Sequence, residues 1–223
     1  MSILDKFLAK RNAGNPTAEM GFTDHIEALR WHLVRSLVAI ILCAVVVFFN
    51  IEWIFEHIIM GPTNSDFVSY KLLCDLGKMI HVDALCLSDV KLRFQNNQLS
   101  GQFMMSFSIS FMLGFIVSFP YVFWEFWKFV KPALKESELK YARGIVFWSS
   151  SLFFVGVAFA YFLIAPFTIN FFAGYQLSPQ FENIITIDNY YDTMSDLVLG
   201  LGIVFELPII VYFLSRVGIL TPK

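Results

Sequence analysis

Four long stretches of this sequence carry almost no charge, and each is long enough to cross a membrane. They run from about 31 to 54, 103 to 124, 144 to 166 and 196 to 215. A transmembrane helix needs roughly 20 consecutive, mostly apolar residues. Of the 223 residues, 57% are hydrophobic and only 15% are charged, whereas about a quarter of a typical soluble domain is charged. The sequence therefore predicts an all-α integral membrane protein with four transmembrane helices in contact with the lipid bilayer.

The distribution of Lys and Arg predicts how the helices are oriented. Segments 1–30, 125–143 and 216–223, together with the start of the first span, hold twelve of the 16 basic residues. Segment 55–102 holds the other four, and 167–195 holds none. The positive-inside rule then places the amino-terminal segment, the loop 125–143 and the end 216–223 in the cytoplasm. The segments 55–102 and 167–195 become extracytoplasmic loops.

The first extracytoplasmic loop, 55–102, is too long to be a simple connection and is expected to be structured. Apolar residues recur at helical spacing between 68 and 80, which predicts an amphipathic helix lying on the membrane surface. Cys74 and Cys86 fall in the same loop, on a side of the membrane that permits disulfides. The sequence leaves two alternatives open for this pair, a disulfide bridge or two buried free thiols.

Two prolines predict interruptions in the later spans. Pro166, followed by turn-forming residues, predicts that the third helix ends near that position. In the fourth span Pro208 follows Glu206 and weakens the local helix. A carboxylate inside a span costs at least ~2.5 kcal/mol on insertion scales, so it is a functional hypothesis by default. Glu206 is then a docking point for another helix or an ion site, or else a protonated group bonded within the bundle.

Several motifs occur in a fixed order along the chain. They are HIEALR at 25–30, YVFWEFWKFVKPAL at 121–134 followed by Glu138, FVGVAFAYFLIAPF at 154–167, and GIVFELP at 202–208. Together they resemble TatC, the multispanning receptor subunit of the twin-arginine protein translocase, over about residues 22 to 220.

The resemblance implies a receptor of the bacterial cytoplasmic (inner) membrane. It would bind twin-arginine signal peptides of folded precursors and export them using the proton motive force. Its partners would be single-span subunits of the TatA and TatB type, and the active complex would contain several copies of the chain. No cofactor is implied. The two arginines of such a signal peptide would bind acidic residues of the receptor, because planar guanidinium groups form paired, charge-assisted hydrogen bonds with carboxylates.

The resemblance carries two groups of functional residues to this sequence. Residues expected to bind signal peptides lie around the cytoplasmic ends of the first two spans: Glu138, Glu27, Arg30, Lys131 and Pro132. Glu206 and Pro208 match the family's intramembrane site, where a partner helix would dock.

The sequence departs from the family pattern in two ways. The family usually has Glu directly before the Leu-Arg pair of the amino-terminal motif, but here Ala28 stands at that position and Glu27 precedes it. One residue along a helix turns a side chain by about 100°, so either Glu27 substitutes or this acidic contact is lost. The family also usually has six spans, so a chain of four is expected to be a fragment or a trimmed form.

Two other function classes were weighed against the receptor. A secondary transporter for a small solute would use Glu206 beside Pro208 as an ion-coupling site, because broken helices with an acidic group form such sites. Corresponding breaks are expected in both halves of a transporter, and the first two spans have none. An enzyme is disfavoured because the four His lie at span ends or in loops. A net charge of −2 argues against nucleic acid, and no Cys/His spacing suggests a metal.

Overall fold

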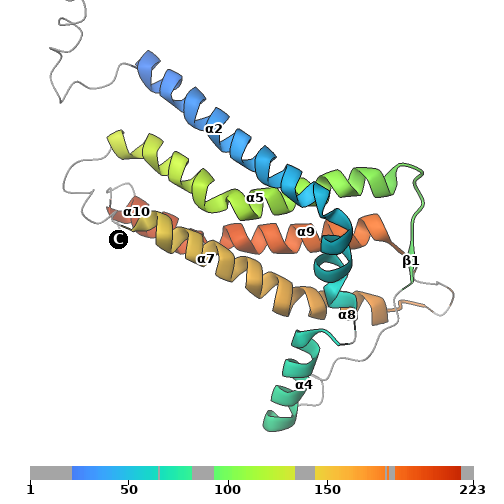
Figure 1. Ribbon diagram of the computed structural model, residues 1–223. Coiled ribbons are helices and arrows are strands. Elements are labelled where there is room, and N and C mark those ends of the chain that lie inside the picture. Colours follow the sequence, from blue (N-terminus) through green and yellow to red (C-terminus); the bar gives the residue numbers. More distant parts are fainter. Residues whose placement is uncertain are drawn as a thin grey trace, which may run out of the picture.

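The computed structural model describes residues 22–64, 66–81, 93–133, 144–178, 180 and 184–216, and Figure 1 shows their arrangement. Four long helical segments carry apolar stretches long enough to cross a membrane, which confirms the predicted number of spans. They are α2 (Phe22–Phe49), α5 (Gly101–Val130), α7 (Ile145–Phe159) with its continuation, and α9 (Ile187–Val204) followed by α10 (Leu207–Arg216). Helices satisfy their own backbone hydrogen bonds, which hydrocarbon requires because it offers no water.

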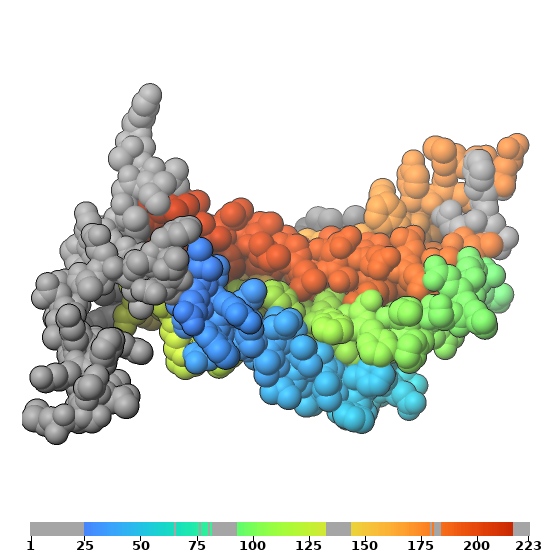
Figure 2. Space-filling model, turned by 90° about the horizontal axis from the view of Figure 1, so that it is seen from above, coloured from blue at the N-terminus to red at the C-terminus, as the bar shows by residue number. Residues whose placement is uncertain are grey.

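Helix α5 lies at the centre of the bundle. Helix α2 packs along one side of it, and α7 and α9 lie on the other, as Figure 1 shows; Figure 2 shows the order of α2, α5 and α9 from above. The core forms where α5 meets α7, with the rings of Phe119 and Phe153 stacked at a centroid distance of 3.7 Å. Most of α2 is exposed, including large apolar side chains such as Leu33 and Leu37, as expected for a helix that faces lipid.

The contact between α2 and α5 depends on a small residue. A Cβ atom placed on Gly114 of α5 would lie 2.8 Å from the backbone nitrogen of Ala44 in α2. Ser110 and Ser118, one turn to either side of Gly114, are buried on the same face of α5. Small residues let membrane helices approach closely, so that van der Waals contact replaces the hydrophobic driving force.

The third span does not end at Pro166, and the prediction that it would was wrong. A π-helical turn, η5 (Ala160–Ile164), joins α7 to α8 (Ala165–Gly174), and Pro166 lies in the first turn of α8. In a π-helical turn the hydrogen bonds reach one residue further along the chain. The missing N–H of Pro166 therefore falls where the bonding pattern changes, and the proline does not stop the helix.

The break predicted in the fourth span is confirmed. Helix α9 ends at Val204 and α10 begins at Leu207, with Pro208 in the first turn of α10. The backbone oxygen of Glu206 accepts hydrogen bonds from the amides of Ile209 (3.1 Å) and Ile210 (3.0 Å), which starts the new helix. At its other end, α9 begins at Ile187, so residues 187–195, predicted to be loop, are helical.

The described parts of the two loops opposite the amino-terminal end of α2 form a cap. It begins with α3 (Ile51–Ile54), the π-helical turn η1 (Phe55–Ile59) and the 3-10 turn η2 (Gly61–Thr63). Helix α4 (Val68–Ile80) follows and confirms the helix predicted there. A short strand, β1 (Phe94–Gln95), pairs in parallel with β2 (Ile185–Thr186) and joins the two loops.

Three tyrosine hydroxyls hold the start of this cap. Each donates a hydrogen bond of 2.6 Å to a backbone carbonyl between residues 58 and 62: Tyr161 to Ile58, Tyr190 to Ile59 and Tyr70 to Pro62. The tyrosines come from the third span, the fourth span and α4, so all three elements converge on one turn. Buried carbonyls need such partners where water is excluded.

The predicted pairing of Cys74 with Cys86 stays a prediction. Cys74 in α4 is disulfide-bonded, and Cys43 in α2 is a free thiol. Cys86 lies outside the described residues.

The close crossing of α2 and α5 can be tested with one methyl group. We expect Gly114→Ala to lower the free energy of unfolding in detergent by about 1–3 kcal/mol, because the added Cβ overlaps the backbone of α2. Gly200→Ala is the matched control, since a Cβ there meets nothing within 4 Å. The control should raise stability by about 0.5 kcal/mol through helix propensity. Equal effects of the two substitutions would contradict the crossing.

Candidate functional site

The amino-terminal end of α2 meets the carboxyl-terminal end of α5 through aromatic contacts. The imidazole of His25 stacks on the ring of Phe129 with centroids 4.3 Å apart, and His32 approaches the same ring edge-on at 6.3 Å. His25 and His32 are seven residues apart, so they lie on one face of the helix. We call this part of the bundle the basic end, after its residues Arg30, Arg35, Lys128 and Lys131.

A buried carboxylate, Glu125 of α5, lies inside the basic end. Its side chain is only 1% exposed. Its Oε2 atom lies 2.6 Å from Nδ1 of His32 and 4.0 Å from Nη1 of Arg35, and its Oε1 atom accepts a 3.0 Å hydrogen bond from Nζ of Lys128. Lys128 also lies 3.2 Å over the ring of Trp124. Both carboxylate oxygens are therefore paired, which a buried charge requires.

Glu125 is not among the site residues predicted from the sequence, because the second span was predicted to end at 124 and the loop to begin at 125. Helix α5 in fact continues to Val130, and η4 (Lys131–Ala133) follows. The stripe of small residues that faces α2 could have revealed it. Glu125 follows Ser118 by seven residues and therefore continues the same face, with Ser110 and Gly114 further back.

The residues predicted to bind signal peptides are exposed where they are described. Glu27 and Arg30 are exposed on α2, and Lys131 and Pro132 are exposed in η4. Glu138 lies outside the described residues. Helix α2 is continuous through this region, so Glu27 points away from the face that carries His25 and His32. Ala28 is half-buried.

The second predicted site, around Glu206, lies at the break between α9 and α10. Glu206 is 5% exposed, and its Oε2 atom accepts a hydrogen bond from the hydroxyl of Ser149 in α7. Its Oε1 atom has no hydrogen-bond partner within the part of the chain that the structure describes. One oxygen is thus tied to the neighbouring helix, and the other can still accept a hydrogen bond.

A close contact of α7 with α9 brings Ser149 to Glu206. A Cβ on Gly202 would lie 2.8 Å from the ring of Phe153, so only glycine fits at this crossing. Pro208 is exposed, and so are large apolar side chains around the break: Ile203, Val204, Leu207, Ile210 and Val211. The geometry combines an apolar outer surface with a partly satisfied carboxylate behind it.

Both sites offer ionic contacts and hydrogen bonds. Across residues 22–64, 66–81, 93–133, 144–178 and 184–216, no three His, Cys, Asp or Glu side chains converge on a point that could hold a metal ion. The paired charges of the basic end and the open acceptor of Glu206 are suited to recognition of charged or polar groups.

Comparison with known proteins identifies the class to which this bundle belongs. The protein is a multi-pass inner-membrane component of a bacterial protein translocase. The family model for the Sec-independent protein translocase protein (TatC) matches residues 24–223, and the chain belongs to that family. The TatC protein of Blattabacterium sp. subsp. Periplaneta americana is 40% identical over 209 residues, which cover 93% of this chain and 79% of the relative.

More distant relatives agree. TatC of Aquifex aeolicus is 27% identical over 205 residues, 92% of this chain and 76% of that protein. The crystal structure of the twin arginine translocase receptor TatC superposes with a TM-score of 0.68 at 26% identity, covering 89% of this chain and 77% of that one. These matches give no support to the alternative of a small-solute transporter.

The role of Glu125 in joining α2 to α5 is testable by its removal. We expect Glu125→Ala to lower the free energy of unfolding by about 1.5–3 kcal/mol, because it removes the charged acceptor of His32 and Lys128. Glu125→Gln should cost less, since the amide oxygen still accepts a hydrogen bond. Asp75→Asn is the control: its exposed pair with Lys78 spans 3.9 Å and should contribute less than about 1 kcal/mol. A loss for Glu125→Ala no larger than the control would contradict this role.

Proposed function

We propose that the basic end is the receptor site for twin-arginine signal peptides of folded precursor proteins. The observation that carries the proposal is the stacking of His25 on Phe129. It holds the start of α2 against the end of α5, from which the chain continues through Pro132 to Glu138. The two carboxylates proposed to bind the two arginines of a signal peptide are Glu27, which is exposed on α2, and Glu138, which follows η4 in the sequence. The related crystal structure is itself titled a twin arginine translocase receptor.

The chemistry of the proposed site favours arginine over lysine. A guanidinium group forms two parallel hydrogen bonds with a carboxylate, whereas an ammonium group acts as a point charge. Arg30 and Lys131 are exposed at the basic end and would contact carbonyl or acidic groups of the bound precursor. Pro132 fixes the backbone of η4 before the chain continues toward Glu138. Glu125 is already paired with His32 and Lys128, so its part is to position α2 against α5.

Charge reversal at Glu138 tests the receptor site. We expect Glu138→Lys to weaken binding of a twin-arginine signal peptide at least tenfold, because a charge-assisted hydrogen bond contributes about 1.5–3 kcal/mol and the new charge repels arginine. Glu138→Ala should have a smaller effect. The measurement is peptide affinity for the purified protein in nanodiscs, compared with a twin-lysine peptide.

Glu136→Lys is the matched control, since it makes the same charge change two residues away. It should leave most of the affinity intact. An equal loss for both lysine variants would indicate a general electrostatic effect and would refute a specific role for Glu138.

We propose that Glu206 and Pro208 form a docking point for the transmembrane segment of a single-span translocase subunit of the TatA or TatB type. The orphan Oε1 atom of Glu206 can accept a hydrogen bond, and the apolar surface around the break can pack against a second helix. An unpaired polar group in hydrocarbon is costly, so a partner that supplies a donor is favoured. Assembly of several copies of the chain with these subunits, driven by the proton motive force, would then move the precursor.

Two substitutions at Glu206 separate hydrogen bonding from charge. Glu206→Gln keeps an acceptor and should retain most recruitment of the single-span subunit, whereas Glu206→Ala should reduce recruitment and export about tenfold or more. The readouts are co-purification of the subunit and export of a folded reporter. Signal-peptide binding at the basic end should persist in both variants. If Glu206→Ala also abolished peptide binding in folded protein, the two sites would not be separate.

A further inference from the structure

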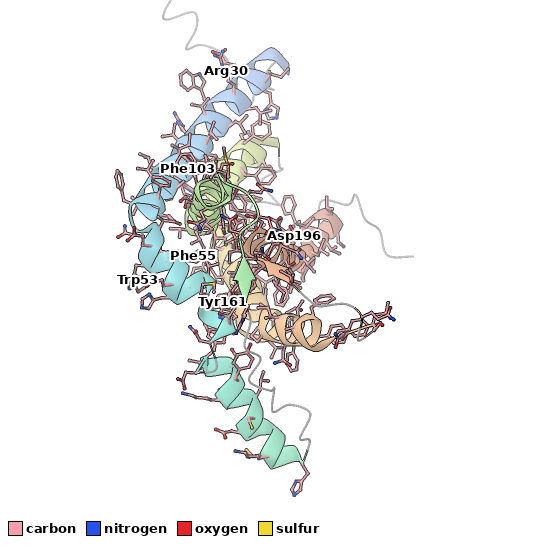
Figure 3. The ribbon with its side chains drawn as sticks, turned by 90° about the vertical axis from the view of Figure 1, so that its right-hand side faces the viewer. Arg30, Trp53, Phe55, Phe103, Tyr161 and Asp196 are labelled. Carbon is pink, nitrogen blue, oxygen red and sulfur yellow. The ribbon has the colours of Figure 1, made fainter. Side chains whose placement is uncertain are left out.

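A cavity of about 440 Å³ opens in the cap, between the segment 51–60, the strand β1 and the first turns of α5. Its size is within the range of small-molecule sites. Figure 3 views the molecule from this side, with Phe55, which lines the cavity, inward of Trp53. The two sites described above lie elsewhere, so the cavity has no part in the proposed receptor or docking functions.

The lining of this cavity combines polar and apolar residues, and along α5 the amide side chain comes first. Gln95, Asn96 and Gln102 line it near the start of α5, whereas Met105 and Ile109 line it one and two turns further along the helix. The seven residues from Gln102 to Ile109 span about 10 Å of helix. The part lined by Met105 and Ile109 therefore lies within the apolar stretch of the second span, and the polar part lies at its outer boundary.

Nearby aromatic residues place the cavity at the membrane interface. Trp53 is exposed and stacks on His57 with centroids 4.9 Å apart. Exposed tryptophans of membrane proteins gather at the level of the lipid headgroups. A ligand here would have its polar group at headgroup depth and its apolar part in hydrocarbon.

The charge of the cavity selects among such ligands. Glu52 is the one charged residue among the described residues that line it, and within the described chain it forms no ion pair. A carboxylate at the mouth favours a cation and disfavours an anion. The amide side chains of Gln95 and Gln102 add oxygen atoms that can accept hydrogen bonds from a group with several N–H donors.

We propose that this cavity binds a phospholipid with a primary ammonium headgroup, such as phosphatidylethanolamine. The ammonium donates to Glu52 and the amide oxygens, and the upper part of one acyl chain lies against Met105 and Ile109. The rest of the lipid remains in the bilayer. The amino terminus of another polypeptide offers similar chemistry, but the bilayer supplies lipid to this depth continuously and at high concentration.

Native mass spectrometry of the delipidated full-length chain tests the proposal. Phosphatidylethanolamine, phosphatidylcholine and phosphatidylglycerol with identical acyl chains are titrated in the same detergent. We expect phosphatidylethanolamine to bind about fivefold more tightly than phosphatidylcholine, whose trimethylammonium group cannot donate hydrogen bonds, and phosphatidylglycerol to bind most weakly. Equal affinity for all three lipids would overturn the proposal.

Two pairs of variants locate the binding. Glu52→Gln should lower the affinity for phosphatidylethanolamine to that for phosphatidylcholine, whereas Glu56→Gln, an exposed acid on the same segment outside the cavity, should not. Ser106→Phe should fill the cavity and abolish the preference, whereas Ser108→Phe, exposed on the same helix outside the cavity, should preserve it. A preference that survives both Glu52→Gln and Ser106→Phe would overturn the site. Displacement of the lipid by an equimolar apolar peptide with a free amino terminus would also overturn the proposal.

Discussion

A carboxylate withdrawn from water has to find partners inside the protein, and two such groups determine how these helices are joined. Glu125 of α5 connects to α2 through His32. Glu206 connects the broken fourth span to α7 through Ser149. Both contacts link elements that are far apart in the sequence. Because lipid is as apolar as the helix surfaces, helix association here depends on such polar contacts and on close packing.

Close packing is the second interaction, after the polar contacts, that holds the helices together. Gly114 lets α2 reach the backbone of α5, and Gly202 lets α9 reach Phe153 of α7. Gly114 lies on the same helix as Glu125. Gly202 lies in α9, four residues before Glu206. The polar contact and the close approach therefore support each other: the helices come near enough for the side chains to pair, and the pairing holds the crossing in register.

Much of this architecture could be predicted from the sequence because membrane spans have a strong compositional signal. The four spans, the helix at 68–80 and the break at Glu206 and Pro208 all follow from apolar length, helical spacing and proline chemistry. The structure shows Pro166 inside a continuous helix, because a π-helical turn accommodates it and no residue pattern marks such a turn. Glu125 was missed because an acidic residue among aromatic ones near a predicted span end resembles the residues of a membrane–water interface. Its pairing inside the bundle involves His32, which is 93 positions away in the sequence. Side-chain partners at that separation are set by the tertiary fold.

The tyrosine hydrogen bonds of the cap have a consequence for biosynthesis. Tyr190 bonds to the carbonyl of Ile59 across 131 positions of the chain. A ribosome adds about 5–20 residues per second, so roughly 7 to 26 seconds separate the synthesis of these two residues. During that interval the carbonyl of Ile59 lacks the tyrosine hydroxyl that bonds to it in the folded protein. The contact of Tyr70 with Pro62 can form early in synthesis, whereas the contact of Tyr190 with Ile59 completes this set of hydrogen bonds only after the start of the fourth helix has been made.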